Sequence, residues 1–319
     1  MSGRIVDSAF RPDPWLRGGH AQTIVAAMFR RAPRIDWRWE RLELPDGDFV
    51  DLAWHGPTPQ EERGPLLLLL HGLAGGADSP YIRDQAAASA LGGVPVVLLC
   101  FRGCSGEPNR LPRGYHSGET QDLRHVVRVL QARHPESMIH AVGFSLGGNV
   151  LLKYLGEQGA ETPLRRAVAV SVPLELGPCA AHLSAGFARV YRQHLLRKLR
   201  AGVREKAPIL ADHVDVEAVL AAKDFEAFDD RLTAPLHGFS SAQDYYARCS
   251  SRPFLRHVVR PTLIVQAVDD PFMPASVIPS AAELSDSVML ERSAWGGHVG
   301  FLGPGRSPWL PRRVQRWWM

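Results

Sequence analysis

The chain has 319 residues, of which 45% are hydrophobic and 22% are charged, and its formal net charge is +4. This composition is typical of a globular protein with a sizeable core, and it excludes collagen-like, low-complexity and intrinsically disordered chains. The apolar run Leu66–Leu70 is far too short to cross a bilayer. Residues 1–4 lack the basic-then-apolar pattern of a secretory signal peptide, so we expect a cytoplasmic protein.

Charge and cysteine usage narrow the class of protein further. The positive charge comes almost wholly from arginine, because the chain has only four lysines, and the charged residues are dispersed along it. We therefore expect a solvated surface and no nucleic-acid partner. The cysteines, which are Cys100, Cys104, Cys179 and Cys249, show no paired Cys-x-x-Cys spacing, so we expect neither a zinc site nor a disulfide framework.

The first predicted elements lie in an N-terminal arm and a hairpin. Residues 1–40 are rich in proline, tryptophan and arginine, and we expect an arm that is irregular apart from one short helix at Ala21–Phe29. After it, Arg41–Pro45 and Phe49–Trp54 alternate polar and apolar residues on either side of an Asp-Gly pair. Alternation around Asp-Gly predicts a β-hairpin.

Residues 41–172 have the pattern of the first part of an α/β core. The runs Leu66–Leu70 and Val94–Phe101 are continuously apolar, as expected for strands that are buried on both faces. Helical patterns separate these runs from further strands at Met138–Val142 and Arg166–Val172. Strands that alternate with helices predict a mostly parallel sheet with helices on both faces.

The alternation stops over residues 173–259, where the sequence is mostly helical. Strand patterns resume at Thr262–Ala267 and Val288–Leu290, which places residues 260–319 in a second part of the core. A helical insertion between two strands of such a sheet predicts a cap or lid. The last segment, Pro308–Met319, predicts a packed helix, with a tryptophan anchor at a membrane surface as the alternative.

The motif most informative about function is Gly143-Phe144-Ser145-Leu146-Gly147. It follows the strand-like run that begins at Met138 and precedes a helical pattern at Asn149–Glu157. Gly-x-Ser-x-Gly at a strand-to-helix junction is a nucleophile elbow, a turn so tight that side chains at the flanking positions would collide. The motif therefore predicts Ser145 as a nucleophile.

A serine hydroxyl needs a histidine to take its proton and a carboxylate to orient that histidine. On this type of sheet the three residues follow in the chain order serine, acid, histidine, each after a strand. Ser145, then Asp269 and Asp270, then His298 occupy these places. A small residue three positions before the acid and a proline four after it favour Asp270, and Asp269 is the alternative.

The segment His71-Gly72-Leu73-Ala74-Gly75-Gly76 directly follows the leucine-rich strand. A hydrolase of this type builds its oxyanion hole there from backbone N–H groups, and we expect the amides of Leu73 and Leu146 to be the donors. We expect His71 to brace the loop rather than to take part in the reaction. The run lacks the Gly-Lys-Ser/Thr of a phosphate-binding loop, and the chemistry requires no cofactor or metal.

At these motifs the chain resembles the α/β-hydrolase superfamily over nearly its whole length, and most closely its YheT-like branch. The matching stretches are Trp15–Thr23, His71–Leu73, Phe101–Gly106, Tyr115–Gly118, Gly143–Asn149, Phe228–Asp230, Thr233–Phe239, Asp269–Phe272 and Gly296–Phe301. The resemblance implies a mostly parallel twisted sheet flanked by helices, with a helical cap insertion and an N-terminal β-hairpin. It also implies a serine carboxylester hydrolase with the triad Ser145, Asp269 or Asp270, and His298.

We therefore expect an enzyme that cleaves carboxylic esters, either short- to medium-chain or lipid-like, through an acyl-enzyme. Thioester cleavage or acyl transfer by the same triad are the alternatives within the enzyme class. A non-catalytic ligand-binding protein on the same fold is the alternative outside it, and transient contact with a membrane surface is a further expectation. The acyl chain, the alcohol and the oligomeric state stay open.

Overall fold

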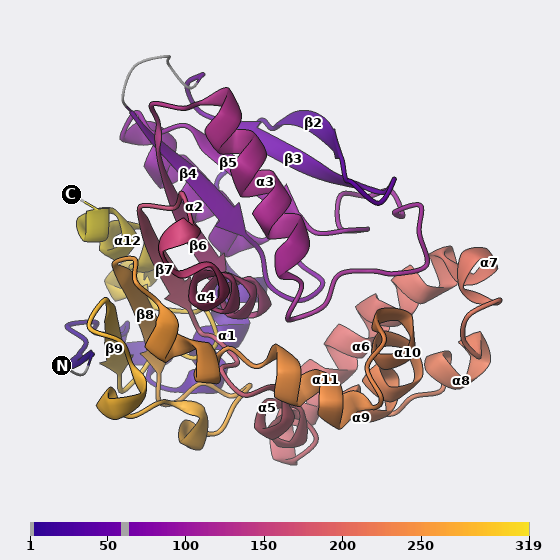
Figure 1. Cartoon of the computed structure of the whole chain (residues 1–319). Helices are drawn as coiled ribbons and strands as arrows, with labels where there is room; N and C mark the ends of the chain where they lie inside the picture. Colours follow the sequence, from indigo (N-terminus) through magenta and orange to yellow (C-terminus); the bar gives the residue numbers. More distant parts are fainter. Residues whose placement is uncertain (1–2, 59–63, 319) are drawn as a thin grey trace.

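A nine-stranded sheet runs through the centre of the structure, a computed structural model that describes residues 3–58 and 64–318 (Figure 1). The strand order is β1-β9-β8-β7-β6-β4-β5-β3-β2. The strands are β1 (Arg4–Asp7), β2 (Arg38–Glu43), β3 (Phe49–His55), β4 (Pro65–Leu70), β5 (Val96–Cys100), β6 (Met138–Phe144), β7 (Arg166–Val170), β8 (Thr262–Ala267) and β9 (Val288–Ser293). In this spatial order, each strand from β1 through β9, β8, β7, β6 and β4 to β5 pairs in parallel with its neighbour. The β2–β3 hairpin joins β5 antiparallel at one edge, which confirms the predicted hairpin and sheet.

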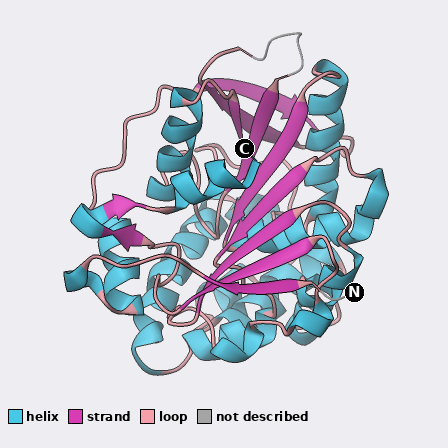
Figure 2. Cartoon of the chain, turned by 90° about the vertical axis from the view of Figure 1, so that its left-hand side faces the viewer, coloured by secondary structure: helices cyan, strands magenta, loops and turns pink. Residues whose placement is uncertain are grey.

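Helices cover both faces of the sheet (Figure 2). They include α2 (Pro80–Leu91), α3 (Thr120–Arg133), α4 (Leu146–Gln158) and α12 (Leu310–Trp318). On β4, Leu66, Leu68 and Leu70 pack with α3 and α4, whereas Leu67 and Leu69 pack on the opposite face with α2 and α12. Successive side chains of a strand point to opposite faces, and full burial of one leucine contributes about 1.5–3 kcal/mol. None of the described helices is both long and apolar enough to cross a membrane.

The N-terminal arm differs from the expectation of a mostly irregular segment. Its helix α1 (Gly19–Met28) lies near the predicted place, but Arg4–Asp7 also forms β1, which pairs in parallel with β9. The strand is short, and its two apolar residues, Ile5 and Val6, are only half-buried. A strand of four residues carries too little alternation to be recognised in the sequence. Its position depends on pairing with the edge of β9.

The C-terminal helix α12 is packed rather than free. Trp309, Trp317 and Trp318 lie against the apolar cluster on the α2 face of the sheet. The Trp318 ring stacks on that of His140, with centroids 5.4 Å apart and planes within 9°. This packing agrees with the packed-helix interpretation of the tryptophans. A small two-stranded sheet, β10 (Leu302–Gly303) and β11 (Ser307–Pro308), precedes the helix.

The chain between β7 and β8 is mostly helical, and we call its helices the cap. Its helices are α5 (Leu176–Leu183), α6 (Arg189–Glu205), α7 (Ala207–Leu210), α8 (Val216–Leu220), α9 (Phe225–Phe228), α10 (Ala234–His237) and α11 (Ala242–Cys249). The cap has its own apolar cluster, with Leu196, Val203 and Phe228 buried in it. Leu73 and Phe272 of the core pack against this cluster. The cap therefore covers two loops at the carboxyl end of the parallel strands.

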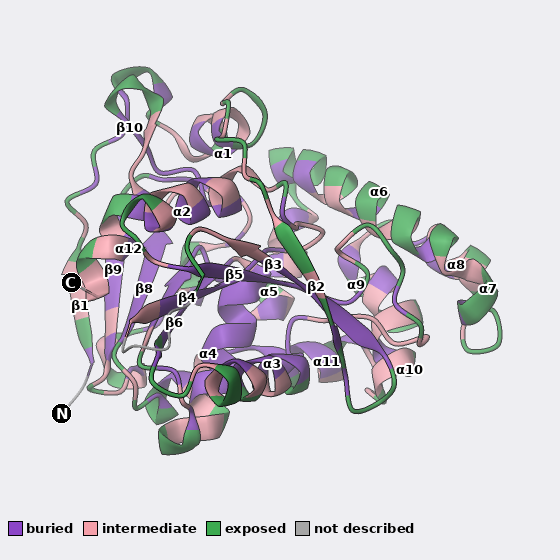
Figure 3. Cartoon of the chain, turned by 90° about the horizontal axis from the view of Figure 1, so that it is seen from above, coloured by how far each residue is buried: buried purple, intermediate pink, exposed green. Residues whose placement is uncertain are grey.

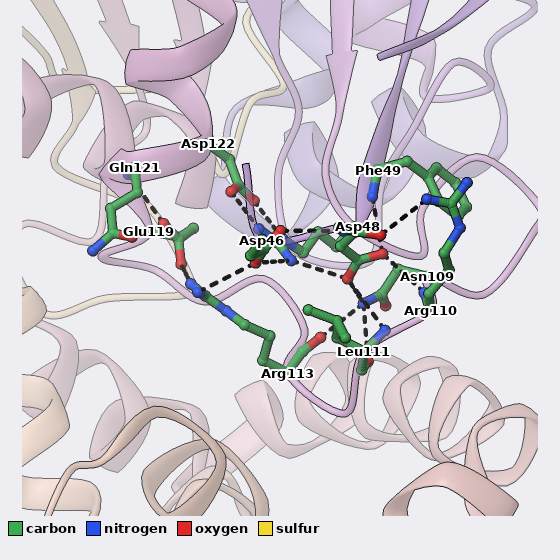
Figure 4. A network of polar contacts seen from close by, with 12 residues as sticks. Asp46, Asp48, Phe49, Asn109, Arg110, Leu111, Arg113, Glu119, Gln121 and Asp122 are labelled. Atoms are coloured by element: carbon green, nitrogen blue, oxygen red, sulfur yellow. Dashed lines mark hydrogen bonds and ion pairs between the residues drawn. The ribbon is translucent and has the colours of Figure 1, made fainter. Parts of the chain in front are cut away.

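A buried arginine, Arg102, links the β2–β3 hairpin to the core. Figure 4 shows the polar network around its partners Asp48 and Asp122. The side chain of Arg102, which follows β5, is 2% exposed, and its guanidinium forms a bidentate pair with Asp122 of α3 at 2.7 Å. It also donates to Asp48 of the hairpin at 2.9 Å. Asp48 in turn accepts from the side chain of Asn109 at 2.6 Å. Because a buried charge is costly unless it is paired, this network fixes the loop that contains Asn109.

Lys206, at the end of α6, binds the same loop and so holds the cap to the core. Its Nζ donates to Asn109 Oδ1 at 2.9 Å and to the carbonyl oxygens of Leu111, Pro112 and Arg113 at 2.6, 3.1 and 3.3 Å. Burial lowers the pKa of Lys206 to about 8. The contact joins the cap to the loop that the Arg102 network fixes.

Candidate active site

The nucleophile elbow is formed by the junction between β6 and α4. Ser145 has φ 51° and ψ −119°, a strained conformation for a residue with a side chain. The backbone packs so closely that a Cβ on Gly143 would lie 2.4 Å from the carbonyl oxygen of Gly147. A Cβ on Gly147 would lie 2.6 Å from the carbonyl oxygen of His71. Steric crowding therefore requires both glycines, and the turn presents the Ser145 hydroxyl beyond the strand.

Three side chains from distant parts of the sequence form a continuous series of hydrogen bonds. Ser145 Oγ lies 2.9 Å from His298 Nε2, and His298 Nδ1 lies 2.9 Å from Asp270 Oδ2. The neutral tautomer with its proton on Nδ1 satisfies both contacts, because Nδ1–H donates to the carboxylate and Nε2 accepts from the hydroxyl. The side chain of Asp270 is 1% exposed and that of His298 is 10% exposed.

The two neighbouring aspartates have different partners. Asp270 faces His298, and its Oδ1 also accepts from the Phe272 amide at 2.8 Å. Asp269 instead accepts from the Gly297 amide at 2.9 Å through Oδ1, and burial raises the pKa of Asp269. The structure thus brings Asp270, the residue that the sequence favours, to the imidazole, and Asp269 braces the loop that carries the histidine.

The N-terminal arm holds the backbone of the His298 loop. Thr23 Oγ1 accepts from the His298 amide at 2.8 Å and donates to the carbonyl of Gly19 at 2.7 Å. The Gln22 side chain accepts from the Leu302 amide at 2.7 Å and donates to the Leu302 carbonyl at 3.0 Å. The sequence singled out this stretch, Trp15–Thr23, only through the family resemblance and gave no role to Thr23 or Gln22.

Aromatic rings pack on the imidazole of His298. The Phe272 ring lies parallel to it, with centroids 3.8 Å apart and planes within 3°. On Phe272 packs Tyr191 of the cap helix α6, at 4.9 Å. The Tyr191 hydroxyl lies 2.9 Å from Nδ1 of His20 on α1. The orientation of the imidazole therefore depends on contacts with both the cap and the N-terminal arm.

The loop after β4 lies beside Ser145, and two tyrosines fix it. A Cβ on Gly72 would lie 3.2 Å from the Cβ of Ser145. The Gly72 amide donates to the hydroxyl of Tyr81 at 2.9 Å, and the Ala74 amide donates to that of Tyr115 at 2.8 Å. In the part of the chain that the structure describes, the amides of Leu73 and Leu146 donate to no protein acceptor. Two N–H groups near Ser145 therefore lack a protein acceptor among the described residues.

His71 braces this loop from below. Its Nε2 accepts from the Phe101 amide at 3.1 Å, and its Nδ1–H donates to the Gly72 carbonyl at 2.8 Å. Burial lowers the pKa of His71 to about 4. A neutral imidazole with both nitrogens engaged is a structural link, which is the arrangement that the sequence analysis expects.

A cavity of about 1450 Å³ opens above Ser145. Ser145, His298 and Leu73 line its floor. The cap lines its walls mainly with apolar side chains, among them Leu183, Leu195, Leu199, Val203, Phe225 and Phe228. The site combines a hydroxyl hydrogen-bonded to histidine and two amides without protein acceptors with a large, mostly apolar space. Such a site can accommodate a ligand that has a carbonyl group and a hydrocarbon portion.

Among the described residues, His116, Glu119 and His237 place metal-ligand atoms within 4.8 Å of one another. Their hydrogen bonds do not suit a metal. Nδ1 of His116 accepts from the Gly118 amide at 3.1 Å, so the proton of the neutral ring is on Nε2, the nitrogen that faces Glu119 at 3.7 Å. Glu119 is also paired with Arg113, whose charge opposes a nearby cation.

Comparison with known proteins agrees with this fold. The family model described as alpha/beta hydrolase fold matches residues 65–303, and the chain belongs to this family. It is 42% identical over 303 residues to YheT of Escherichia coli K12, a protein named as a candidate esterase, across 93% of this chain and 89% of YheT. Within the family, the chain therefore falls in the YheT-like branch.

More distant relatives extend the comparison. The chain is 30% identical over 318 residues to human phospholipase ABHD3, covering 97% of this chain and 78% of that protein. The solved structure of the Pyrococcus furiosus esterase Pf2001 matches with a TM-score of 0.59 at 16% identity, over 89% of this chain and 90% of that chain. At this identity the structural likeness shows the fold alone.

Proposed function

We propose that this chain is a serine hydrolase of carboxylic esters, with Ser145 as nucleophile, His298 as general base and Asp270 as the carboxylate that orients it. The observation that carries the proposal is the unbroken hydrogen-bonded chain from Ser145 through His298 to Asp270 at the floor of the cavity. Relatives named as an esterase and as a phospholipase support ester hydrolysis as the reaction class.

The reaction begins with attack of Ser145 Oγ on the carbonyl carbon of the ester. As the new C–O bond forms, the hydroxyl proton passes to Nε2 of His298, and the carbonyl electrons move to oxygen. Asp270, hydrogen-bonded to Nδ1–H, stabilises the imidazolium that results. When the tetrahedral intermediate collapses, the C–O bond to the alcohol breaks, and His298 gives its proton to the leaving alkoxide.

The amides of Leu73 and Leu146 are the proposed donors to the oxyanion. Their N–H groups are held by the backbone and need no reorganisation during the reaction. Loss of one such donor typically lowers turnover by about 100- to 1000-fold. The tyrosine hydroxyls that fix Gly72 and Ala74 therefore support catalysis by holding Leu73 in place.

Hydrolysis of the acyl-enzyme completes the cycle. Water attacks the acyl carbon, its proton passes to His298, and the ester bond to Ser145 breaks as the serine oxygen regains a proton. The apolar walls of the cavity favour an acyl chain of short to medium length or a lipid-like ester over a charged substrate. No step needs a cofactor.

The substitution Ser145→Ala tests the proposal. We expect the variant to stay folded, to lose hydrolysis of short- and medium-chain p-nitrophenyl esters, and to lose labelling by a fluorophosphonate probe. Ser105→Ala is the matched control, because Ser105 also lines the cavity but bonds to Asp51. Turnover by Ser145→Ala at the level of the unsubstituted protein would refute the assignment.

The same assay separates the alternatives. Acyl-CoA substrates and added alcohols distinguish thioester cleavage and acyl transfer from ester hydrolysis. A protein that neither turns over substrates in this panel nor reacts with the probe would be a ligand-binding module on the hydrolase fold.

A further inference from the structure

A group of large apolar side chains lies exposed at the rim of the cavity. Met28, Phe29, Phe187 and Val190 are 73%, 67%, 53% and 55% exposed, and Trp39 of the hairpin is 50% exposed. We call these five residues the rim patch. Met28, Trp39 and Val190 also line the cavity. A side chain that lines a cavity and is also half exposed lies at its opening.

The packing of α1 against α6 brings together the residues of the rim patch other than Trp39, which lies on β2. The His20 ring of α1 lies 4.8 Å from the Phe187 ring and 2.9 Å, through Nδ1, from the Tyr191 hydroxyl. Ile24, one turn further along α1, packs against the apolar cluster of the cap. Residues four apart share one face of a helix, so Met28 continues the face of α1 that is turned toward α6. Viewed from above, α1 lies beside the beginning of α6 (Figure 3).

The rim patch is surrounded by positive charge. Helix α6 carries Arg189, Arg192, Arg197, Lys198, Arg200 and Arg204 but only one acidic residue, Glu205. In the described part of the chain Arg189, Lys198 and Arg200 donate to carbonyl oxygens and Arg197 contacts His194. None of the six cations forms an ion pair with a carboxylate of the described residues. The segment after α1 adds the exposed Arg31, Arg34 and Arg38 against Asp36.

Apolar side chains interspersed with unpaired arginines are the features of a protein surface that binds an anionic bilayer. The aromatic and aliphatic groups enter the boundary between head groups and acyl chains, and the arginines contact lipid phosphates. An acidic protein partner would use the charge, but a patch this apolar beside the opening of an apolar cavity matches lipid better.

We propose that the rim patch and α6 dock the protein on the surface of an anionic phospholipid bilayer, with the cavity opening turned toward the lipid. This site is distinct from the C-terminal tryptophans, which pack against the core. Binding itself does not need the triad. On the proposed function, docking lets a lipid-like ester move from the bilayer toward Ser145 without crossing bulk water.

Co-sedimentation with large unilamellar vesicles tests the proposal. We expect the full chain to pellet with vesicles of phosphatidylcholine mixed with phosphatidylglycerol, to pellet much less with phosphatidylcholine alone, and to be released by added salt. The double variant Phe29→Ser/Phe187→Ser should partition about tenfold more weakly. Leu91→Ser is the control, because Leu91 is 90% exposed on α2 and does not line the cavity.

Two further measurements separate the contribution of charge to vesicle binding from any loss of esterase activity. Arg189→Glu/Arg197→Glu should abolish the preference for anionic vesicles. Phe29→Ser, which changes a side chain outside the cavity lining, should hydrolyse a soluble p-nitrophenyl ester like the unsubstituted protein. The inference is overturned if the unsubstituted protein does not pellet with anionic vesicles, or if the rim variants pellet as it does. Vesicle binding by a protein without esterase activity would refute the proposed function and leave the docking surface in place.

Discussion

The hydroxyl of Thr23 offers a sensitive test of how the fold supports the proposed base. Thr23→Val keeps the shape of the side chain and removes the oxygen that accepts from the His298 amide at 2.8 Å. The residue is 6% exposed, so the amide loses its acceptor in a largely buried position. An unsatisfied buried polar group costs about 1–3 kcal/mol, and we expect the free energy of unfolding to fall by about that amount.

We expect kcat to fall even at a temperature where the variant is fully folded, so lost stability alone does not account for the change. Without its backbone anchor the His298 loop can shift, and a displacement of about 1 Å at a reacting group can cost about 100-fold. We expect kcat for a p-nitrophenyl ester to fall by about 10- to 100-fold. KM should change little, because valine keeps the volume of the threonine side chain where it lines the cavity. Thr23→Ser, which keeps the hydroxyl, should restore most of the activity.

Thr162→Val provides the matched control. Thr162 is 1% exposed, its hydroxyl accepts from the Leu164 amide at 3.2 Å, and it lies outside the cavity lining. Urea unfolding and steady-state kinetics of the two variants separate the roles, since both should lose similar stability but only Thr23→Val should lose kcat. Equal kcat values for the two variants, at a temperature where both are folded, would refute the reasoning.

Two further predictions concern carboxylates and a buried histidine. Asp270→Asn should lower kcat for ester hydrolysis by about 10⁴-fold, because an amide does not hold the Nδ1–H tautomer of His298. Asp269→Asn keeps an oxygen that accepts from the Gly297 amide, so it should lower kcat by less than about tenfold. Equal losses of kcat in the two variants would contradict the assignment of Asp270. Burial lowers the pKa of His140 from 6.5 to about 4. Between these values the folded state binds fewer protons than the unfolded state, so stability is lost as the pH falls through that window. His140→Phe, which retains an aromatic ring against Trp318, should make the unfolding free energy measured in urea less steep in pH there, and an unchanged slope would count against this account.

The buried strands could be predicted because the sheet is covered on both faces. A strand without a solvent face has a continuous apolar run, and Thr262–Ala267 is β8 residue for residue. The edge strand β1 lacked this signal, since its four residues have the burial pattern exposed, half-buried, half-buried, exposed. Its place is set by β9, which lies far along the chain.

Local patterns identified the candidate site residues but not all of the residues that hold them in place. The glycines around Ser145 and His298 mark tight turns after strands, which a sequence displays directly. Whether Asp269 or Asp270 turns toward the histidine depends on the backbone after β8, and only weak spacing arguments bear on it. The Thr23–His298 hydrogen bond joins residues 275 positions apart, and no spacing rule connects them.

The stacked rings of Tyr191, Phe272 and His298 link the cap to the chemistry. If the cap moved outward, Tyr191 would leave Phe272, and the His298 imidazole would lose part of the aromatic packing that fixes its orientation. The open cap would therefore admit a bulky ester, and only the closed cap would hold the imidazole in position to cleave it. In such a hydrolase, the turnover number would report how often the cap shuts.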